Sequence, residues 1–268
     1  MSPHFAAYSF VDRITDFEPA KRARGQFAVP AHVPAFSACL VAEAVGQLAA
    51  WVSMAHIDFR GRPVAALATE TRFHGDAVPG RTLDLEVDIA DCDDDAVAYS
   101  GAAYVGGTRI IELVDCLGPM LPLADFDDPR AMAARFALLT DGGAPPGRFH
   151  GVRRPPIARD GAVAMLDVPA SAPFFNDHFP RRPVFPATLM LDAQIELAVC
   201  VARETWRDAT PVRMTNVKVR SFTPPGTRLV LGAEVRERGE RETTFNLSAH
   251  ADGKSVATAR VVIAQGLQ

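Results

Sequence analysis

The chain has 268 residues, of which 48% are hydrophobic and 22% are charged, and its formal net charge is −4. This length suits one large domain or two of about 130 residues, and the composition is that of an ordinary globular protein. The slight negative charge argues against nucleic-acid binding. Four scattered cysteines without a C-x-x-C pair argue against a disulfide scaffold or a zinc site.

The most apolar segment runs from Ala38 to Ala55 and carries Glu43 and Gln47 within it. A charged and an amide side chain make this segment a poor membrane span and a good buried helix. The first residues show no basic start followed by an apolar run, so no secretory signal is predicted. We therefore expect a soluble, cytoplasmic protein that does not associate with a membrane.

An internal repeat organises the chain. The segment VPAHVPAF, which begins at Val29, matches VPASAPFF, which begins at Val168. Each is followed by a long apolar helix with one acid near its start, Glu43 in the first and Asp192 in the second. The two valines are 139 positions apart, whereas the two acids are 149 apart. The second copy therefore holds ten residues that the first lacks, about NDHFPRRPVF at 176–185.

Segments with alternating apolar residues, the period of β-strands, follow each predicted helix. Pro79 with Gly80, and Pro225 with Gly226, mark the turns that open corresponding strands in the two copies. The helices are predicted over 37–51 and 186–200. The clearest strands are predicted over 83–89, 98–104, 228–235, 243–249 and 256–263.

A helix that is apolar on nearly all sides must be surrounded, and an antiparallel sheet can curl around it. The repeat therefore predicts an α+β fold with two similar halves. The stretch DGGAPPG at 141–147 has the composition of a linker. We place an N-terminal domain at 1–140 and a C-terminal domain at 148–268.

The segment PFFNDHFPRRPVFPATLMLDA at 173–193 resembles the loop and helix of bacterial 3-hydroxyacyl-acyl-carrier-protein dehydratases, roughly PFF-x-x-HFP-x-x-PV-x-P-G and then an acid. In that family the acid lies fourteen residues after the histidine, as Asp192 does after His178. FVDRITDFEP at 10–19 resembles the family's opening strand, and Glu43 followed by Gln47 resembles its helix. The resemblance implies a double hotdog, that is, two antiparallel sheets, each wrapped around a long central helix.

In the family each active site is composite, with the histidine from one hotdog and the acid from the helix of its partner. The resemblance therefore pairs His178 with Glu43, and Gln47 lies one turn after Glu43 on the same helix face. A second site would need a histidine loop in the first half, which that half lacks. His32 is the nearest substitute there, but in the repeat alignment it matches Ser171, seven residues before His178. We expect that second site to be inactive and Asp192 to be a remnant. A dyad of His178 and Asp192 within one motif is the less favoured alternative.

These residue types suit the dehydration of a 3-hydroxyacyl thioester. Neutral His178 would remove the Cα proton, and Glu43, among apolar helix neighbours that favour its protonated form, would protonate the leaving hydroxyl. The free N–H of Ala187, at the start of the second helix, would hold the thioester oxygen. No metal or nucleotide motif is found, so no cofactor is expected beyond the phosphopantetheine that carries the substrate.

Further residues of the motif are candidates for substrate contacts. Phe175, Phe179 and Phe185 would line an acyl tunnel, or are plain core. Arg181 and Arg182 would contact the phosphopantetheine phosphate or an acidic carrier protein, or are ordinary surface residues. The other histidines are interpreted as structural or surface residues: His32, His56, His74, His150 and His250.

The main hypothesis is the dehydration of 3-hydroxyacyl groups on acyl carrier protein, or on CoA, to trans-2-enoyl thioesters. The setting would be fatty-acid, polyene or polyketide biosynthesis, with the fused pseudo-dimer as a candidate for further oligomerisation. Fused hotdogs of polyketide dehydratases carry the histidine in the first half and the acid in the second, the reverse of this chain. The alternatives are a hotdog thioesterase, an enoyl-CoA hydratase, and a non-catalytic acyl-binding or scaffolding partner of an active dehydratase.

Overall fold

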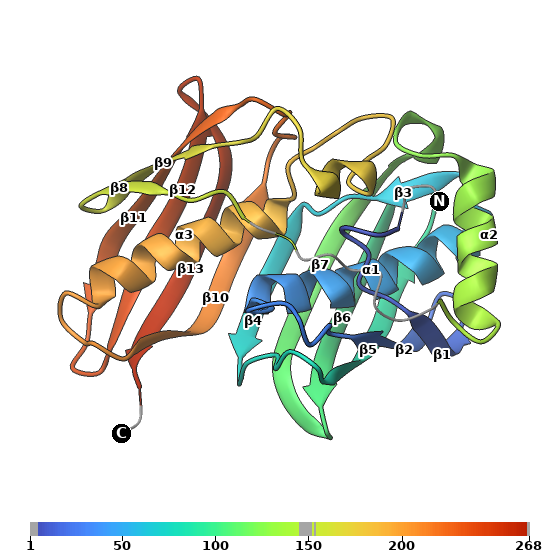
Figure 1. Cartoon of the computed structure of the whole chain (residues 1–268), viewed down its shortest axis with the longest axis horizontal. Coiled ribbons are helices and arrows are strands. Elements are labelled where there is room, and N and C mark those ends of the chain that lie inside the picture. The colour runs from blue at the N-terminus through green and yellow to red at the C-terminus, as the bar shows by residue number, and fades with distance from the viewer. Residues whose placement is uncertain (1–4, 145–151, 153, 267–268) are drawn as a thin grey trace.

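The computed structural model describes residues 5–144, 152 and 154–266 of the chain. It is an α+β structure in which a 13-stranded antiparallel sheet packs against helices (Figure 1). The strand order along the sheet is β1-β2-β5-β6-β7-β4-β10-β13-β12-β11-β9-β8, and β3 pairs with β7.

In chain order the elements are β1 (Arg13–Glu18), β2 (Arg22–Ala28), α1 (Ala38–His56), β3 (Gly61–Pro63), β4 (Leu67–Phe73), β5 (Thr82–Cys92), β6 (Ala96–Val105), β7 (Thr108–Pro122), the short 3-10 helix η1 (Leu123–Asp125), α2 (Pro129–Thr140), β8 (Ala158–Asp160), β9 (Val163–Asp167), η2 (Pro173–Asn176), α3 (Ala187–Ala202), β10 (Ala209–Val219), β11 (Arg228–Arg238), β12 (Glu242–Ala251) and β13 (Lys254–Gln265).

The two halves share one continuous sheet, so the prediction of two separate sheets was wrong. Strand β4 pairs with β10 in antiparallel register, from Arg72 opposite Arg213 to Leu67 opposite Lys218. An edge strand leaves a row of backbone N–H and C=O groups unpaired. Joining the halves edge to edge pairs both rows, and the joint lies beside the two central helices.

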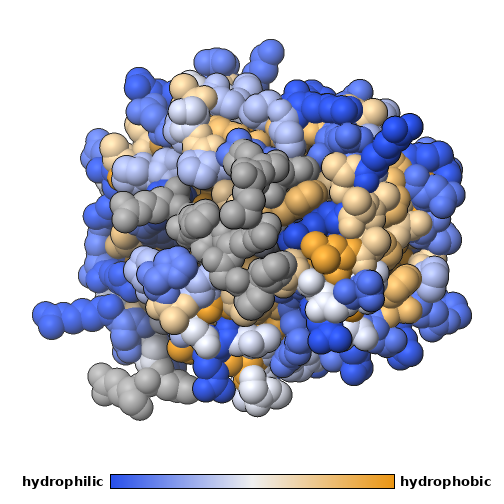
Figure 2. Space-filling view, turned by 45° about the vertical axis from the view of Figure 1, so that its right-hand side comes forward, coloured by the Kyte–Doolittle hydropathy of each residue, from blue (hydrophilic) through white to orange (hydrophobic). Residues whose placement is uncertain are grey.

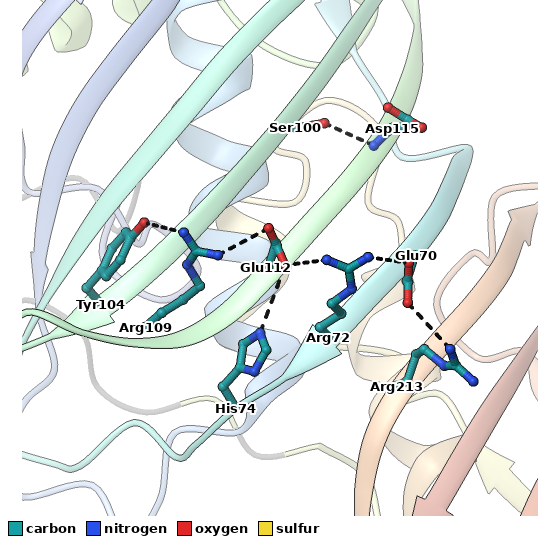
Figure 3. Close-up of polar contacts among 9 residues, drawn as sticks. All are labelled: Glu70, Arg72, His74, Ser100, Tyr104, Arg109, Glu112, Asp115 and Arg213. Atoms are coloured by element: carbon teal, nitrogen blue, oxygen red, sulfur yellow. Dashed lines mark hydrogen bonds and ion pairs between the residues drawn. The ribbon is translucent and has the colours of Figure 1, made fainter.

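Charged side chains also cross this joint. Arg213 of β10 lies 3.9 Å from Glu70 of β4, and Arg72 contacts Glu70 at 2.9 Å and Glu112 of β7 at 2.8 Å (Figure 3). Arg72 and Arg213 are exposed, and such surface ion pairs contribute little each. The backbone pairing, rather than these charges, therefore sets how the halves meet. Figure 2 shows a face on which hydrophilic residues surround patches of hydrophobic ones.

Both predicted central helices are present, and Figure 1 shows them along the same side of the sheet. Helix α1 has the length and composition of a membrane-spanning helix, yet 61% of that stretch is buried inside the fold. A buried position is typical of the central helix of a folded domain. Helix α1 begins after Ser37, whose side chain caps it, whereas α3 begins after Pro186 without a side-chain cap.

All five predicted strands fall within β5, β6, β11, β12 and β13. The two predicted Pro-Gly turns are present, and their glycines have φ of +82° at Gly80 and +78° at Gly226, a region that favours glycine. Helix α2 was not predicted and packs against β1. Residues 145–147 of the expected linker lie outside the described residues, so the division into domains at 1–140 and 148–268 stays a prediction.

Candidate active site

His178 lies in the loop between η2 and α3, and its own loop fixes the ring. The backbone N–H of His178 donates to Phe174 O at 2.9 Å, and Nδ1 lies 2.8 Å from Val184 O. A carbonyl oxygen can only accept, so Nδ1 carries the proton and Nε2 keeps a free lone pair. Burial lowers the pKa of His178, although the charge of Glu43 and the bond to Val184 oppose that shift. The ring is therefore neutral near pH 7 and basic at Nε2.

Glu43 lies in the second turn of α1, and both of its carboxyl oxygens have donors. Oε1 accepts from Gln47 Nε2 at 3.0 Å, and Oε2 accepts from Thr188 Oγ1 of α3 at 2.9 Å. The expectation of an apolar surrounding was therefore wrong for the carboxyl group itself. The apolar neighbours in sequence flank the backbone of Glu43, while its side chain extends to groups of the other half. The carboxyl is thus held in one orientation.

Gln47 connects Glu43 to the chain before β1. Its Oε1 accepts from Phe10 N at 2.7 Å, which assigns the amide orientation, and its Nε2 donates to Tyr8 O at 2.9 Å and to Glu43. The amide therefore both satisfies backbone groups and orients the carboxyl.

One cavity of about 210 Å³ brings the predicted residues together. His178 of the second half lines it together with Glu43 and Gln47 of the first half. Residues Ala187 and Thr188 at the start of α3 line it too. Two of the three phenylalanines, Phe179 and Phe185, also lie on the cavity wall. Phe175 does not, because its ring is buried in the main core, where it packs against Phe174 at 4.6 Å between centroids. Phe175 is thus part of the hydrophobic core.

The start of α3 offers backbone donors at this cavity. The N–H groups of Leu189 and Met190 already bond to Pro186 O at 3.1 and 3.2 Å. No side chain in the described part of the chain caps the helix, so the N–H groups of Ala187 and Thr188 remain at its positive end. This arrangement can stabilise negative charge on a carbonyl oxygen.

Arg181 and Arg182 bind the His178 loop to the first half. Arg181 Nη1 donates to Ala124 O at 2.8 Å, and its backbone N–H donates to Phe126 O at 3.1 Å. The guanidinium of Arg182 lies over Phe222, 4.7 Å from the ring centroid, and 5.5 Å from that of Phe126. Both arginines remain exposed, and contact with a carrier stays a prediction.

Four residues near the site were not predicted: Tyr8, Arg62, Asp177 and Thr188. The Arg62 guanidinium lies 4.2 Å from the centroid of Phe179 and 3.4 Å from Asp127, and burial lowers its pKa to about 10. The ring of Phe179 stacks on His178 at 4.1 Å between centroids. Asp177 and Thr188 lie inside the motif at 173–193, but no local sequence pattern predicts them as site residues. Tyr8 and Arg62 have no local signal either.

The second acid has a different surrounding. Asp192 Oδ2 accepts from Arg154 Nε at 2.8 Å, and the same guanidinium also pairs with Glu196, four residues further along α3. Cys39, the second residue of α1, matches Thr188, the second residue of α3. The thiol of Cys39 lies near enough to Asp192 for that charge to add to burial in raising the cysteine pKa. An arginine thus pairs with both acids where a histidine loop would be needed.

No group of three or more His, Cys, Asp or Glu side chains that could hold a metal ion occurs among the residues the structure describes.

Solved structures with this fold act on acyl thioesters. An acyl-ACP thioesterase from Bacteroides thetaiotaomicron aligns with a TM-score of 0.57 at 11% identity, covering 90% of this chain and 97% of that one. The dehydratase domain of PpsC from Mycobacterium tuberculosis, in complex with C12:1-CoA, aligns with a TM-score of 0.52 at 14% identity, covering 96% and 99%. Such likeness defines the fold class, the double hotdog of thioesterases and dehydratases.

Sequence similarity narrows the class. Residues 156–260 match the ApeI-like family, described as ApeI dehydratase. The 3-hydroxyacyl-[acyl-carrier-protein] dehydratase FabZ of Streptococcus mutans is 30% identical over 114 residues, covering 41% of this chain and 81% of that protein. FabZ of Paramagnetospirillum magneticum is 31% identical over 110 residues, covering 38% and 68%. The chain belongs to the hotdog-fold dehydratase family of FabZ and ApeI, as the resemblance predicted.

Proposed function

We propose that the protein dehydrates 3-hydroxyacyl thioesters on acyl carrier protein or CoA to trans-2-enoyl thioesters, with His178 as base and Glu43 as acid. One observation carries the proposal. A neutral imidazole with a free Nε2 and an oriented carboxyl come from different halves and line the same cavity, beside the open start of α3. Family membership supports the reaction type, and the names of the relatives support the carriers.

The residues act in a defined order. His178 Nε2 takes a proton from Cα, and the electron pair moves to the thioester oxygen, where the N–H of Ala187 stabilises the enolate. The carbonyl then re-forms, the Cα–Cβ double bond forms, and the Cβ–O bond breaks. The departing oxygen takes the proton of protonated Glu43 and leaves as water. His178 has gained one proton and Glu43 has lost one, so a return of that proton through solvent restores both groups.

The test uses the full chain and a 3-hydroxyacyl group loaded on acyl carrier protein or on CoA. Mass spectrometry of the carrier should show loss of one water. His178→Ala should lower kcat/KM by about 10²- to 10⁴-fold, whereas His250→Ala, in β12 of the second half, should not change it. Binding without any product from either carrier would overturn the proposal and favour a non-catalytic acyl-binding partner.

A thioesterase is the second candidate, since thioesterases share the fold. Thiol release measured on the same substrates separates the two. A thioesterase frees the carrier thiol and leaves a free acid, whereas a dehydratase leaves the thioester intact with one double bond added. Hydration of a 2-enoyl-CoA would be the same reaction in reverse, and it should depend on His178 equally.

A further inference from the structure

Asp177, next to His178, holds the chain that precedes β1. We call residues 5–10 the N-terminal arm. The carboxylate of Asp177 accepts from the backbone N–H of Ala7 at 2.8 Å, of Tyr8 at 2.7 Å and of Phe5. Asp177 is buried, and a buried carboxylate is stable only when it is bonded in this way. The arm of the first half is therefore tied to the histidine loop of the second.

This tie brings the Tyr8 side chain to the candidate active site. Its ring packs edge-on against His178 at 5.4 Å between centroids, and its hydroxyl lies 2.5 Å from Thr188 Oγ1. Thr188 Oγ1 in turn lies 2.9 Å from Glu43 Oε2. A chain of three side chains thus runs from Tyr8 through Thr188 to Glu43.

The proton count sets the direction of this chain. Thr188 has one hydroxyl proton, which it donates to Glu43 Oε2, so Tyr8 must donate to Thr188. Burial and the charge of Glu43 raise the pKa of Tyr8 well above its ordinary value. The phenol therefore keeps its proton and stays a donor.

The matching position in the other half has no such chain. Cys39 stands in α1 where Thr188 stands in α3, and a thiol is a weak donor. Its acid, Asp192, takes a direct bond from Arg154 instead. Thr188 is partly buried. A hydroxyl removed from water costs free energy unless it is bonded, and valine would fill the volume of Thr188. The hydroxyl pair is thus present at the acid that shares a cavity with His178.

We infer that Thr188 and Tyr8 are positioning residues for Glu43, holding its carboxyl where it delivers a proton to the leaving hydroxyl; this rests on the proposed function. Thr188 acts directly on the carboxyl and Tyr8 acts through Thr188. Loss of either hydroxyl should therefore slow the chemical step and leave substrate binding unchanged.

The test compares Thr188→Val, Tyr8→Phe and Thr188→Ser, measured as kcat and KM for dehydration. Thr188→Val should lower kcat by about 10- to 100-fold with KM unchanged, the effect of losing one hydrogen bond to the carboxyl group. Tyr8→Phe should lower kcat by less. The double variant should be no worse than Thr188→Val alone, because both changes break one chain. Thr188→Ser, which keeps the hydroxyl, should retain most activity.

Matched control variants remove a threonine hydroxyl and a tyrosine hydroxyl away from the candidate site. Thr243→Val changes a buried threonine in β12, and Tyr104→Phe changes a tyrosine bonded to Arg109 on the outer sheet face; neither should alter kcat. Wild-type kcat in Thr188→Val, equal loss in Thr188→Ser, or additive effects of Tyr8→Phe and Thr188→Val would each overturn the inference.

A crystal structure of Thr188→Val gives a reading that does not depend on activity. The Glu43 carboxyl should rotate away from its wild-type position while His178 stays in place, and an unmoved carboxyl would contradict the inference. Failure of the proposed function is distinguishable, because it appears in the wild-type chain as an absence of enoyl product.

Discussion

The two central helices carry an acid at the same place, and the two acids have opposite surroundings. Glu43 and Asp192 are each the sixth residue of their helix, α1 and α3. Glu43 receives neutral donors, from Gln47 and Thr188, and shares a cavity with His178. Asp192 is paired with Arg154. One position in a repeated helix can therefore hold an acid among neutral donors or in an ion pair, depending on which loop and which half lie against it.

The helix starts differ in the same way. Ser37 caps α1, its side chain accepting from Leu40 N at 3.4 Å, whereas α3 follows Pro186 and has no side-chain cap within the described residues. A side-chain cap places its own oxygen at the helix start, where a bound oxygen could otherwise lie. The open helix start and the neutral donors thus occur together, on the side of the fold that holds His178.

The largest expected difference in kcat/KM is between two variants in which one of these acids is replaced by its amide. Glu43→Gln removes the proposed proton donor and should lower kcat/KM by about 10²- to 10⁴-fold. Asp192→Asn should leave it near the wild-type value, since Asp192 only pairs with Arg154. Both are measured by loss of water from a 3-hydroxyacyl carrier. An active Glu43→Gln beside an inactive Asp192→Asn would reverse the assignment and favour the dyad within one motif.

Loss of Arg154 should affect stability and not activity. Arg154→Met leaves Asp192 and Glu196 near each other without a cation, and the Arg154 and Asp192 side chains are only 18% and 23% exposed. We expect a loss of about 1–3 kcal/mol in the free energy of unfolding at pH 7, measured by denaturant titration.

The matched control for that change is Arg159→Met. Arg159 pairs with Glu204, whose side chain is 63% exposed, and loss of such a surface pair should cost below about 1 kcal/mol. If the two variants lose the same free energy of unfolding, the ion pair of Arg154 stabilises the fold no more than an exposed surface pair does.

The smallest expected effect is a shift in pH dependence. Burial holds the pKa of His178 below its ordinary value of 6.5, and the positive charge of Arg62 lowers it further. The proposed base works when neutral, so activity should fall as the pH drops through that lowered pKa. Arg62→Gln removes the charge, raises the pKa of His178, and should move the acid limb of kcat/KM to higher pH by less than about one unit.

Arg228→Gln serves as the control for that shift, because Arg228 of β11 pairs with exposed Asp167 of the neighbouring strand β9. Its pH profile should match the wild type. If the pH profile of Arg62→Gln stays in place or moves to lower pH, the charge of Arg62 does not lower the pKa of His178.

Part of the site could be predicted because its signals are local or repeated. The motif around His178 lies within one stretch, and the repeat, together with the composite site that the resemblance implies, predicted Glu43 as the acid of the other half. The contacts of Asp177 could not be predicted, since its partners Phe5, Ala7 and Tyr8 lie 169 to 172 positions away. Helix α2 did have a local signal that was not used, Asp128 followed by Pro129.

The sequence by itself determined the α+β class, the two central helices, five of the strands and the family. These follow from periodicity, turn residues and a motif, which act over short distances along the chain. Only the tertiary structure decided that one sheet runs through both halves, that Glu43 is held by neutral donors, and that Arg154 pairs with Asp192. Each of these depends on which strand edges and side chains meet across the halves, and a side chain's surroundings are set by that contact rather than by its neighbours in sequence.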